Sequence, residues 1–308
     1  MNKKIIVICG PTAVGKTEYT IDTALHFNGE VVSCDSMQLY KYMDIGSAKP
    51  TAEEQAKVKH HLIDCIDPSE MFTVHTYQTM AREAMEDIFS RGKTPVIAGG
   101  TGLYLNSLLY EMDFSAPPGD EAFRNALYKE AEEQGPESVY AKLQAQAPDV
   151  AERIHQNNVK KVVRALEALH LGETIKDFSK DPVPVTDYEV QLIGLTRNRD
   201  ELYDRINRRV DLLVDQGLFE EVKSLLDRGL TESDISMKGI GYKEIIGYFD
   251  GRYSKEEAID LVKKNTRHYA KRQLTWFKRY KEMKWFNLSL YSTKEECQEE
   301  MFSWLKKN

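Results

Sequence analysis

Several features that mark particular protein classes are scarce in this sequence. Only four cysteines occur among the 308 residues, without a CxxC spacing, and no stretch approaches 18 consecutive apolar residues. A disulfide framework and a transmembrane helix are therefore not expected. The start of the chain has neither a long apolar segment nor a small-residue cleavage site, so we expect no signal peptide. Together these absences predict a reduced, cytoplasmic protein with no membrane contact.

The charge of the chain is acidic overall but unevenly distributed. Its net charge is −7, because 49 Asp and Glu outnumber 42 Lys and Arg, which by itself argues weakly against nucleic-acid binding. Residues 260–284, however, contain nine Lys or Arg and only two acids. Distribution matters more than the sum, so this part of the chain can still attract an anionic polymer.

Hydrophobic segments in the first hundred residues alternate with segments of helical spacing. This alternation predicts an α/β fold, in which a parallel sheet is flanked by helices. A further strand is expected beyond the middle of the chain, and helical patterns dominate from residue 198 to the C-terminus. The expected strands are residues 4–9, 30–34, 61–66, 94–98 and 189–195, and residues 73–90 have clear helical spacing.

A mostly helical insertion interrupts this α/β pattern. Proline-containing breaks at 117–119 and 182–184 bound it, and its segments are rich in Ala, Glu and Lys. We therefore expect a core of residues 1–114 and 181–308, and an insertion domain of residues 115–180. Within the insertion, helices are expected at 121–133, 137–147 and 158–171.

A phosphate-binding loop follows the first expected strand and precedes a helix. It matches the pattern GxxxxGK[ST], and the strand–loop–helix context supports the match. Glycines let the backbone close around a phosphate, the lysine adds a charge, and the final hydroxyl is placed to hold Mg²⁺. The pattern predicts polyphosphate binding in a P-loop NTPase-like fold, but does not separate a hydrolase from a transferase. The loop consists of Gly10, Pro11, Thr12, Ala13, Val14, Gly15, Lys16 and Thr17.

The strand at 94–98 is followed by glycines and a threonine rather than by a carboxylate that could activate water. An acceptor other than water is therefore favoured. Asp35 follows the second strand and Thr101 the strand at 94–98, so both should lie at the edge of the sheet where ligands bind. Asp35 could equally be a turn or helix-capping residue, and the glycine turn could form without a ligand.

The sequence resembles the bacterial tRNA dimethylallyltransferases. The resemblance spans nearly the whole chain, and the second of its motifs is far more specific than the phosphate loop. The matching segments are GPTAVGKT at 10–17, SCDSMQLYKYMDIGSAKP at 33–50, AGGTGLY at 98–104, RALEAL at 164–169, IGYKEI at 240–245 and TRHYAKRQLTWFKR at 266–279.

That resemblance implies a specific reaction. A dimethylallyl group would pass from dimethylallyl diphosphate to N6 of the adenosine 3′ of the anticodon, in tRNAs that read codons starting with U. The phosphate loop would hold the diphosphate, with Mg²⁺ at Thr17. Asp35 would be the general base, Thr101 would bond the leaving oxygen, and Arg205 would neutralise diphosphate charge.

The resemblance also implies a surface for the tRNA anticodon stem-loop, and we expect the chain to be a monomer. Considered alone, the basic helix at 267–279 could equally be a solvated charged face with its tryptophan in the core; interleaved cations and aromatics favour RNA. The implied tRNA-binding residues are Asp35, Ser36, Met37, Gln38, Thr101, Arg124, Lys160, Lys161, Arg164, Arg267, Lys271, Arg272, Gln273, Trp276 and Arg279.

The chain departs from the family pattern at three positions. Asn158 and Lys161 stand where the family often has Asp and Arg, and His268 stands where an arginine is frequent. Lysine keeps the charge but not the bidentate phosphate contact of arginine. Two other functions remain to be compared: a nucleotide-driven RNA-binding ATPase, for which no site that activates water is evident, and a small-molecule kinase in which Asp35 activates a hydroxyl.

Overall fold

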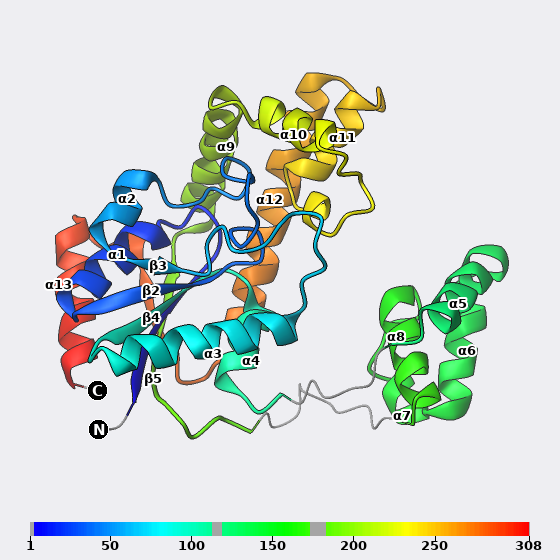
Figure 1. Cartoon of the computed structure of the whole chain (residues 1–308), viewed down its shortest axis with the longest axis horizontal. Coiled ribbons are helices and arrows are strands. Elements are labelled where there is room, and N and C mark those ends of the chain that lie inside the picture. The colour runs from blue at the N-terminus through cyan, green and yellow to red at the C-terminus, as the bar shows by residue number, and fades with distance from the viewer. Residues whose placement is uncertain (1–2, 113–118, 173–182, 308) are drawn as a thin grey trace. The chain divides into compact units, whose positions relative to one another are not determined.

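A six-stranded parallel sheet forms the centre of the fold (Figure 1). The computed structural model describes residues 3–112, 119–172 and 183–307. The strand order is β3-β2-β4-β1-β5-β6, so the strand leading into the phosphate loop lies in the middle. The predicted α/β fold is confirmed. The strands are β1 (Lys4–Cys9), β2 (Gly29–Cys34), β3 (His60–His61), β4 (Thr94–Gly99), β5 (Glu189–Thr196) and β6 (Lys284–Asn287).

Both faces of the sheet are covered by helices, because side chains alternate along each strand. On β1, Ile5 and Val7 pack on one face with α3 (Val74–Ser90) and α4 (Gly102–Leu109). Ile6 and Ile8 point the other way and pack with α1 (Lys16–His26) and α13 (Lys294–Lys307). Burial on both faces explains why the central strands are nearly continuous apolar runs.

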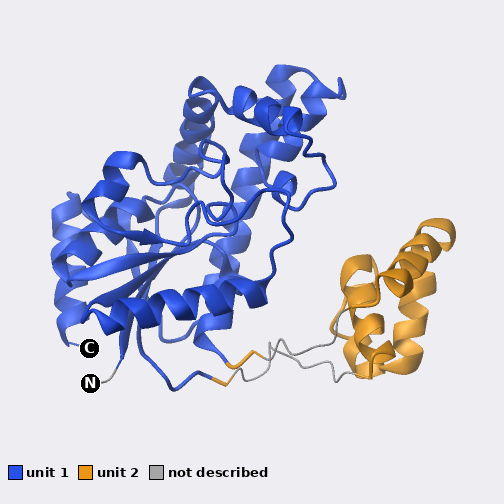
Figure 2. Cartoon of the chain, in the orientation of Figure 1, with its two compact units in different colours: residues 1–110, 184–308 blue, residues 111–183 orange. Residues whose placement is uncertain are grey.

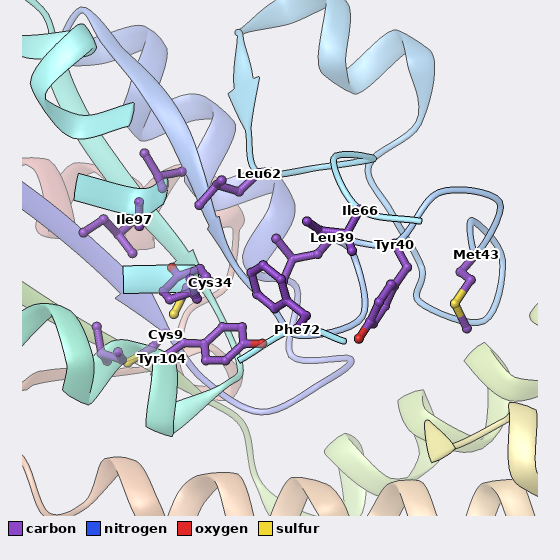
Figure 3. Packing of buried hydrophobic residues seen from close by; sticks show 14 of the residues in the cluster. Cys9, Cys34, Leu39, Tyr40, Met43, Leu62, Ile66, Phe72, Ile97 and Tyr104 are labelled. Atoms are coloured by element: carbon purple, nitrogen blue, oxygen red, sulfur yellow. The ribbon is translucent and has the colours of Figure 1, made fainter. Parts of the chain in front are cut away.

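The first core extends beyond the sheet into the segment that follows β2. Figure 3 shows Leu39, Tyr40 and Met43 along this segment, which continues from the strand residue Cys34. Leu39 and Met43 are fully buried. Because its apolar side chains are part of the core, the connection that carries Ser36, Met37 and Gln38 is a packed element of the fold.

Two strand predictions require correction. The strand expected at 61–66 is reduced to His60–His61, because Leu62 and Asp64 have positive φ angles of 61° and 54°, which end the extended conformation. β6 was not predicted. Its four residues pair with β5 and close the sheet at the edge opposite β3.

Four helices of the C-terminal region stand over one end of the sheet (Figure 1). α12 begins with a capping box between Ser254 and Glu257 and ends at Phe277, so the basic segment is helical up to that residue and not to 279. The four are α9 (Arg199–Asp215), α10 (Leu218–Asp227), α11 (Tyr242–Phe249) and α12 (Lys255–Phe277). The short elements of this part of the chain are α2 (Ala52–Lys57) and the 3₁₀ turns η1 (Ser236–Lys238) and η2 (Leu288–Leu290).

The chain divides into two compact units, residues 1–110 with 184–308 and residues 111–183 (Figure 2). The boundaries expected at 115 and 180 fall outside the described residues. The second unit has a core of its own, in which Val139, Leu143 and Val162 are fully buried. Its helices are α5 (Glu121–Gln134), α6 (Pro136–Gln146), α7 (Pro148–Ala151) and α8 (Val159–His170). No helix in the described part of either unit is long and apolar enough to cross a membrane.

Candidate active site

A cavity of about 1610 Å³ opens at the carboxyl ends of the central strands. Its lining includes residues of the phosphate loop, the segment after β2, the end of β4, α9, the segment around η1 and α12. Lys16 and Asp35 are both among them, although β4 separates their two strands. The structure therefore brings the polyphosphate motif and the candidate base into one space, as expected for the ligand crevice of a parallel sheet.

The phosphate loop has the conformation that its glycines require. Gly15 has a φ of 109° and is the N-cap of α1, so the first amides of that helix face the loop. A Cβ on Gly10 would lie 2.5 Å from the carbonyl oxygen of Leu195, so only glycine fits beside β5. Two arginines hold the carbonyls of the loop: Arg205 Nε donates to the Ala13 carbonyl at 3.0 Å, and Arg197 Nε to the Val14 carbonyl at 2.9 Å.

Lys16 lies deep in the cavity, where its Nζ donates to the carbonyl of Pro11 at 2.9 Å. Burial lowers the pKa of Lys16 to about 8; the Asp35 carboxylate opposes this shift, and the Arg209 guanidinium adds to it. Burial also lowers the pKa of Arg209, again opposed by Asp35. Two partly buried cations therefore lie near one carboxylate, and this excess of positive charge attracts a further anion.

The lowered pKa of Lys16 predicts that diphosphate affinity depends on pH. A bound anion raises this pKa above 8, so the charged lysine is the form that binds. Below pH 8 the lysine of the free protein is already charged; above it, binding must take up a proton, and affinity should fall by up to about tenfold per pH unit. Titration calorimetry with dimethylallyl diphosphate from about pH 7 to 9.5 measures this. Lys16→Arg should flatten the profile, and an equally steep profile in that variant would assign the titration to another group.

The two carboxylate oxygens of Asp35 differ in their contacts. Its Oδ1 accepts a hydrogen bond from the Met37 amide at 2.9 Å, which is the turn contact that the sequence left open. Its Oδ2 accepts no hydrogen bond from any residue that the structure describes. The side chain lines the cavity with this second oxygen unused, so the two interpretations of Asp35 are compatible.

The hydroxyl of Thr101 is engaged within the protein. It accepts from the Ser36 amide at 3.0 Å and lies 3.4 Å from the Ser36 hydroxyl, while the Thr101 amide donates to the Cys34 carbonyl at 3.1 Å. These bonds tie the glycine turn to the start of the segment after β2. A bond from Thr101 to a leaving oxygen would have to replace the contact with Ser36.

Gln273 is a buried residue that bonds to the phosphate loop and to the glycine turn. Its side chain is 5% exposed, its Oε1 accepts from the Thr12 amide, and its Nε2 donates to the Gly100 carbonyl, both at 2.9 Å. Both polar ends of the side chain are thus bonded within the protein, and a direct contact between Gln273 and tRNA stays a prediction. Its amide connects the phosphate loop to the glycine turn, so α12 positions both.

The other expected tRNA-binding residues of α12 occupy two faces. Arg272 is exposed within the cavity lining, and Trp276 is half-buried against Gly102, where a Cβ would lie 2.3 Å from the indole. Lys271 is exposed on the outside, and the Arg279 guanidinium, just past the helix end, lies 4.9 Å from the Trp276 ring. Arg267 is half-buried and donates to Asn207 on α9.

Four expected tRNA-binding residues belong to the second unit. Arg124 on α5 donates to the buried carboxylate of Glu167 at 2.6 Å, and Arg164 on α8 lies 3.5 Å from the same carboxylate. Lys160 and Lys161 are exposed on the first turn of α8. Glu167 holds Arg124 in place, whereas the Arg164 side chain is 64% exposed and is accessible, like the two lysines.

Sequence reasoning missed two residues of the cavity. Arg209 was not singled out, although it carries the same charge four residues after Arg205, and both side chains line the cavity from one face of α9. Tyr269 lines the cavity, and burial and then the Asp35 carboxylate keep its pKa well above the usual value. Its position three residues before Arg272 on α12 was the available signal.

Comparisons with known proteins agree with the motifs. The family model described as IPP transferase matches residues 38–280. The chain belongs to the IPP transferase family. It is 52% identical over 300 residues to the tRNA dimethylallyltransferase of Alkaliphilus oremlandii, with 97% of this chain and 96% of that protein covered. The tRNA dimethylallyltransferase of Clostridioides difficile is 47% identical over 302 residues, covering 98% and 97% of the two chains.

Solved structures of IPP transferases share the fold. The full-length tRNA isopentenylpyrophosphate transferase of Bacillus halodurans superimposes with a TM-score of 0.75 at 42% identity, covering 99% of this chain and 96% of that one. A eukaryotic dimethylallyltransferase acting on tRNA gives a TM-score of 0.77 at 30% identity, covering 93% and 74%. The resemblance recognised in the sequence is confirmed.

Proposed function

We propose that this IPP transferase moves a dimethylallyl group from dimethylallyl diphosphate to N6 of the adenosine 3′ of the anticodon, in tRNAs that read codons starting with U. Family membership makes the chain a prenyl-transferring enzyme. The products are N6-isopentenyladenosine and diphosphate. The observation that supports this proposal most directly is that Asp35 shares one cavity with Lys16 and the phosphate loop, which suits a base acting beside an anionic leaving group.

The residues of the cavity divide the chemistry between them. The N6 amine is a weak nucleophile, because its lone pair is delocalised into the purine. Asp35 takes the N6 proton as the new C–N bond forms and the C–O bond to diphosphate breaks. Lys16, Arg209 and the amides at the start of α1 stabilise the charge that develops on diphosphate. Arg205 lines the same cavity and shares this role, while its Nε and that of Arg197 hold the loop carbonyls.

Magnesium is the cofactor that fits this site. Thr17 follows Lys16 in the first turn of α1 and lines the cavity, so its hydroxyl faces the same space as the loop amides. A single hydroxyl completed by phosphate oxygens and water is a donor set that Mg²⁺ accepts. When bound, Mg²⁺ would neutralise part of the diphosphate charge.

The partners follow from the same proposal. The tRNA anticodon stem-loop is the acceptor, contacted by Ser36, Met37 and Gln38 beside the base and by the cations of α12 and the second unit. We place the enzyme in the cytoplasm as a monomer, with dimethylallyl diphosphate as the donor.

The proposal is tested by mass analysis of hypomodified tRNA after incubation with the enzyme, dimethylallyl diphosphate and Mg²⁺. We expect one adenosine per acceptor tRNA to gain a dimethylallyl group, with release of diphosphate. ATP in place of the prenyl donor should give no transfer. RNA-stimulated ATP hydrolysis without prenylation would instead favour a nucleotide-driven RNA-binding protein, and phosphorylation of a small alcohol would favour a kinase.

A further inference from the structure

Glu221, on α10, receives an unusual set of hydrogen bonds from the segment that follows β2. The amides of Asp44 and Ile45 donate to its Oε2, each at 2.7 Å, and the amide of Gly46 donates to its Oε1 at 2.9 Å. The hydroxyl of Tyr242 on α11 also donates to Oε1, at 2.8 Å. One carboxylate therefore binds three successive backbone amides and a phenol, which is how proteins hold an anion firmly.

Gly46 and Tyr242 pack closely beside the Glu221 carboxylate. A Cβ on Gly46 would lie 2.5 Å from the Tyr242 ring, so only glycine admits the ring at this point. Tyr242 is fully buried, and burial and then the Glu221 carboxylate keep its pKa well above the usual value. The phenol therefore stays protonated and remains a donor to Glu221. Glycine, tyrosine and carboxylate form one packed unit that fixes residues 44–46.

From residues 44–46 the segment leads back to the base-binding residues. Lys49, whose side chain is 4% exposed, donates to Asp44 at 2.7 Å and to the Tyr40 carbonyl at 2.6 Å. In the same segment, the Ala48 carbonyl accepts a hydrogen bond from Gln38 Nε2 at 3.4 Å. Gln38 Oε1 accepts one from the Ser33 hydroxyl at 3.0 Å. These two bonds fix the orientation of the Gln38 amide, with Oε1 toward Ser33 and Nε2 toward Ala48.

We propose that Glu221 is a positioning residue, which orients Gln38 for recognition of the target adenine by anchoring the amides of residues 44–46. An amide that presents a donor and an acceptor together matches the adenine edge, and such recognition fails when the amide is free to rotate. This inference rests on the proposed function, since it assumes that an adenine enters the cavity beside Gln38.

The test uses Glu221→Gln, with Glu220→Gln as the matched control. Glu220 is the exposed neighbour on the same helix, so both variants lose one negative charge at nearly the same place. Glutamine at 221 has one acceptor oxygen for four donors, and its NH₂ group would face two of them, so the segment is released. We expect the KM for tRNA to rise about 10- to 100-fold, the usual range for one bidentate base contact. The kcat and the KM for dimethylallyl diphosphate should stay within about twofold of wild type.

A double-mutant cycle separates positioning from a general structural role. If Glu221 acts through Gln38, then adding Glu221→Gln to Gln38→Ala should raise the KM for tRNA little further. Additive effects of the two substitutions, or an equal loss in kcat and in the KM for both substrates, would overturn the inference. Tyr242→Phe removes one of the four donors and should give a smaller change in the same direction. Absence of prenyl transfer by the wild type and the Glu220 variant would contradict the proposed function instead.

Discussion

Replacing Asp35 by asparagine should reduce the rate of prenyl transfer about 10²–10⁴-fold, the usual contribution of a positioned base. Asparagine keeps an oxygen that can accept from the Met37 amide, so the turn persists, but it cannot take the N6 proton. The affinity for tRNA should fall much less, because phosphate contacts supply most of it. Single-turnover transfer and tRNA binding, measured on the same preparation, test both expectations.

Asp35→Ala provides the comparison, because it removes the turn contact as well as the base. If both variants slow transfer equally while tRNA affinity is kept, the lost function is proton abstraction. If asparagine transfers the prenyl group at nearly the wild-type rate and only alanine is impaired, then Asp35 is a turn residue and the base must be sought elsewhere in the cavity.

Replacing Arg209 by glutamine should lower kcat/KM for dimethylallyl diphosphate about 10²–10³-fold, the loss typical of one group that stabilises transition-state charge. Arg209 is the cation of α9 whose charge acts on both Lys16 and Asp35. The effect should appear in kcat as well as in KM, because charge on diphosphate grows as the C–O bond breaks. Steady-state kinetics with saturating tRNA measures this.

Arg199→Gln is the matched control for that experiment. Arg199 begins the same helix, is exposed, and lies 5.1 Å from the Tyr203 ring, away from the cavity lining. It should leave the kinetics near wild type. Arg205→Gln should also lower kcat/KM, because that side chain lines the same cavity as well as holding the Ala13 carbonyl. An Arg205 variant worse than the Arg209 variant would restore Arg205 as the principal diphosphate contact.

The amino-acid sequence by itself determined those features whose causes are local. The phosphate loop is contiguous, and glycines at 10 and 15 permit the close approach and the left-handed conformation that it needs. The apolar runs of β1 and β4 are buried on both faces, which makes them recognisable without knowledge of their neighbours. A strand of two residues such as β3 carries no such signal, because it lies at the edge of the sheet and depends on its pairing with β2.

Tertiary structure alone decided which of several equivalent residues reach the reacting groups. α9 carries four arginines, and the direction in which it packs places Arg205, Arg208 and Arg209 in the cavity lining and leaves Arg199 outside it. Gln273 lies in a basic, RNA-like segment, yet burial turns its amide toward Thr12 and Gly100. The Glu221 carboxylate accepts a hydrogen bond from the Asp44 amide, although the two residues are 177 positions apart in the sequence. Such contacts depend on how the helices pack on the sheet. The residue types and spacing within a single helix or strand do not determine that packing.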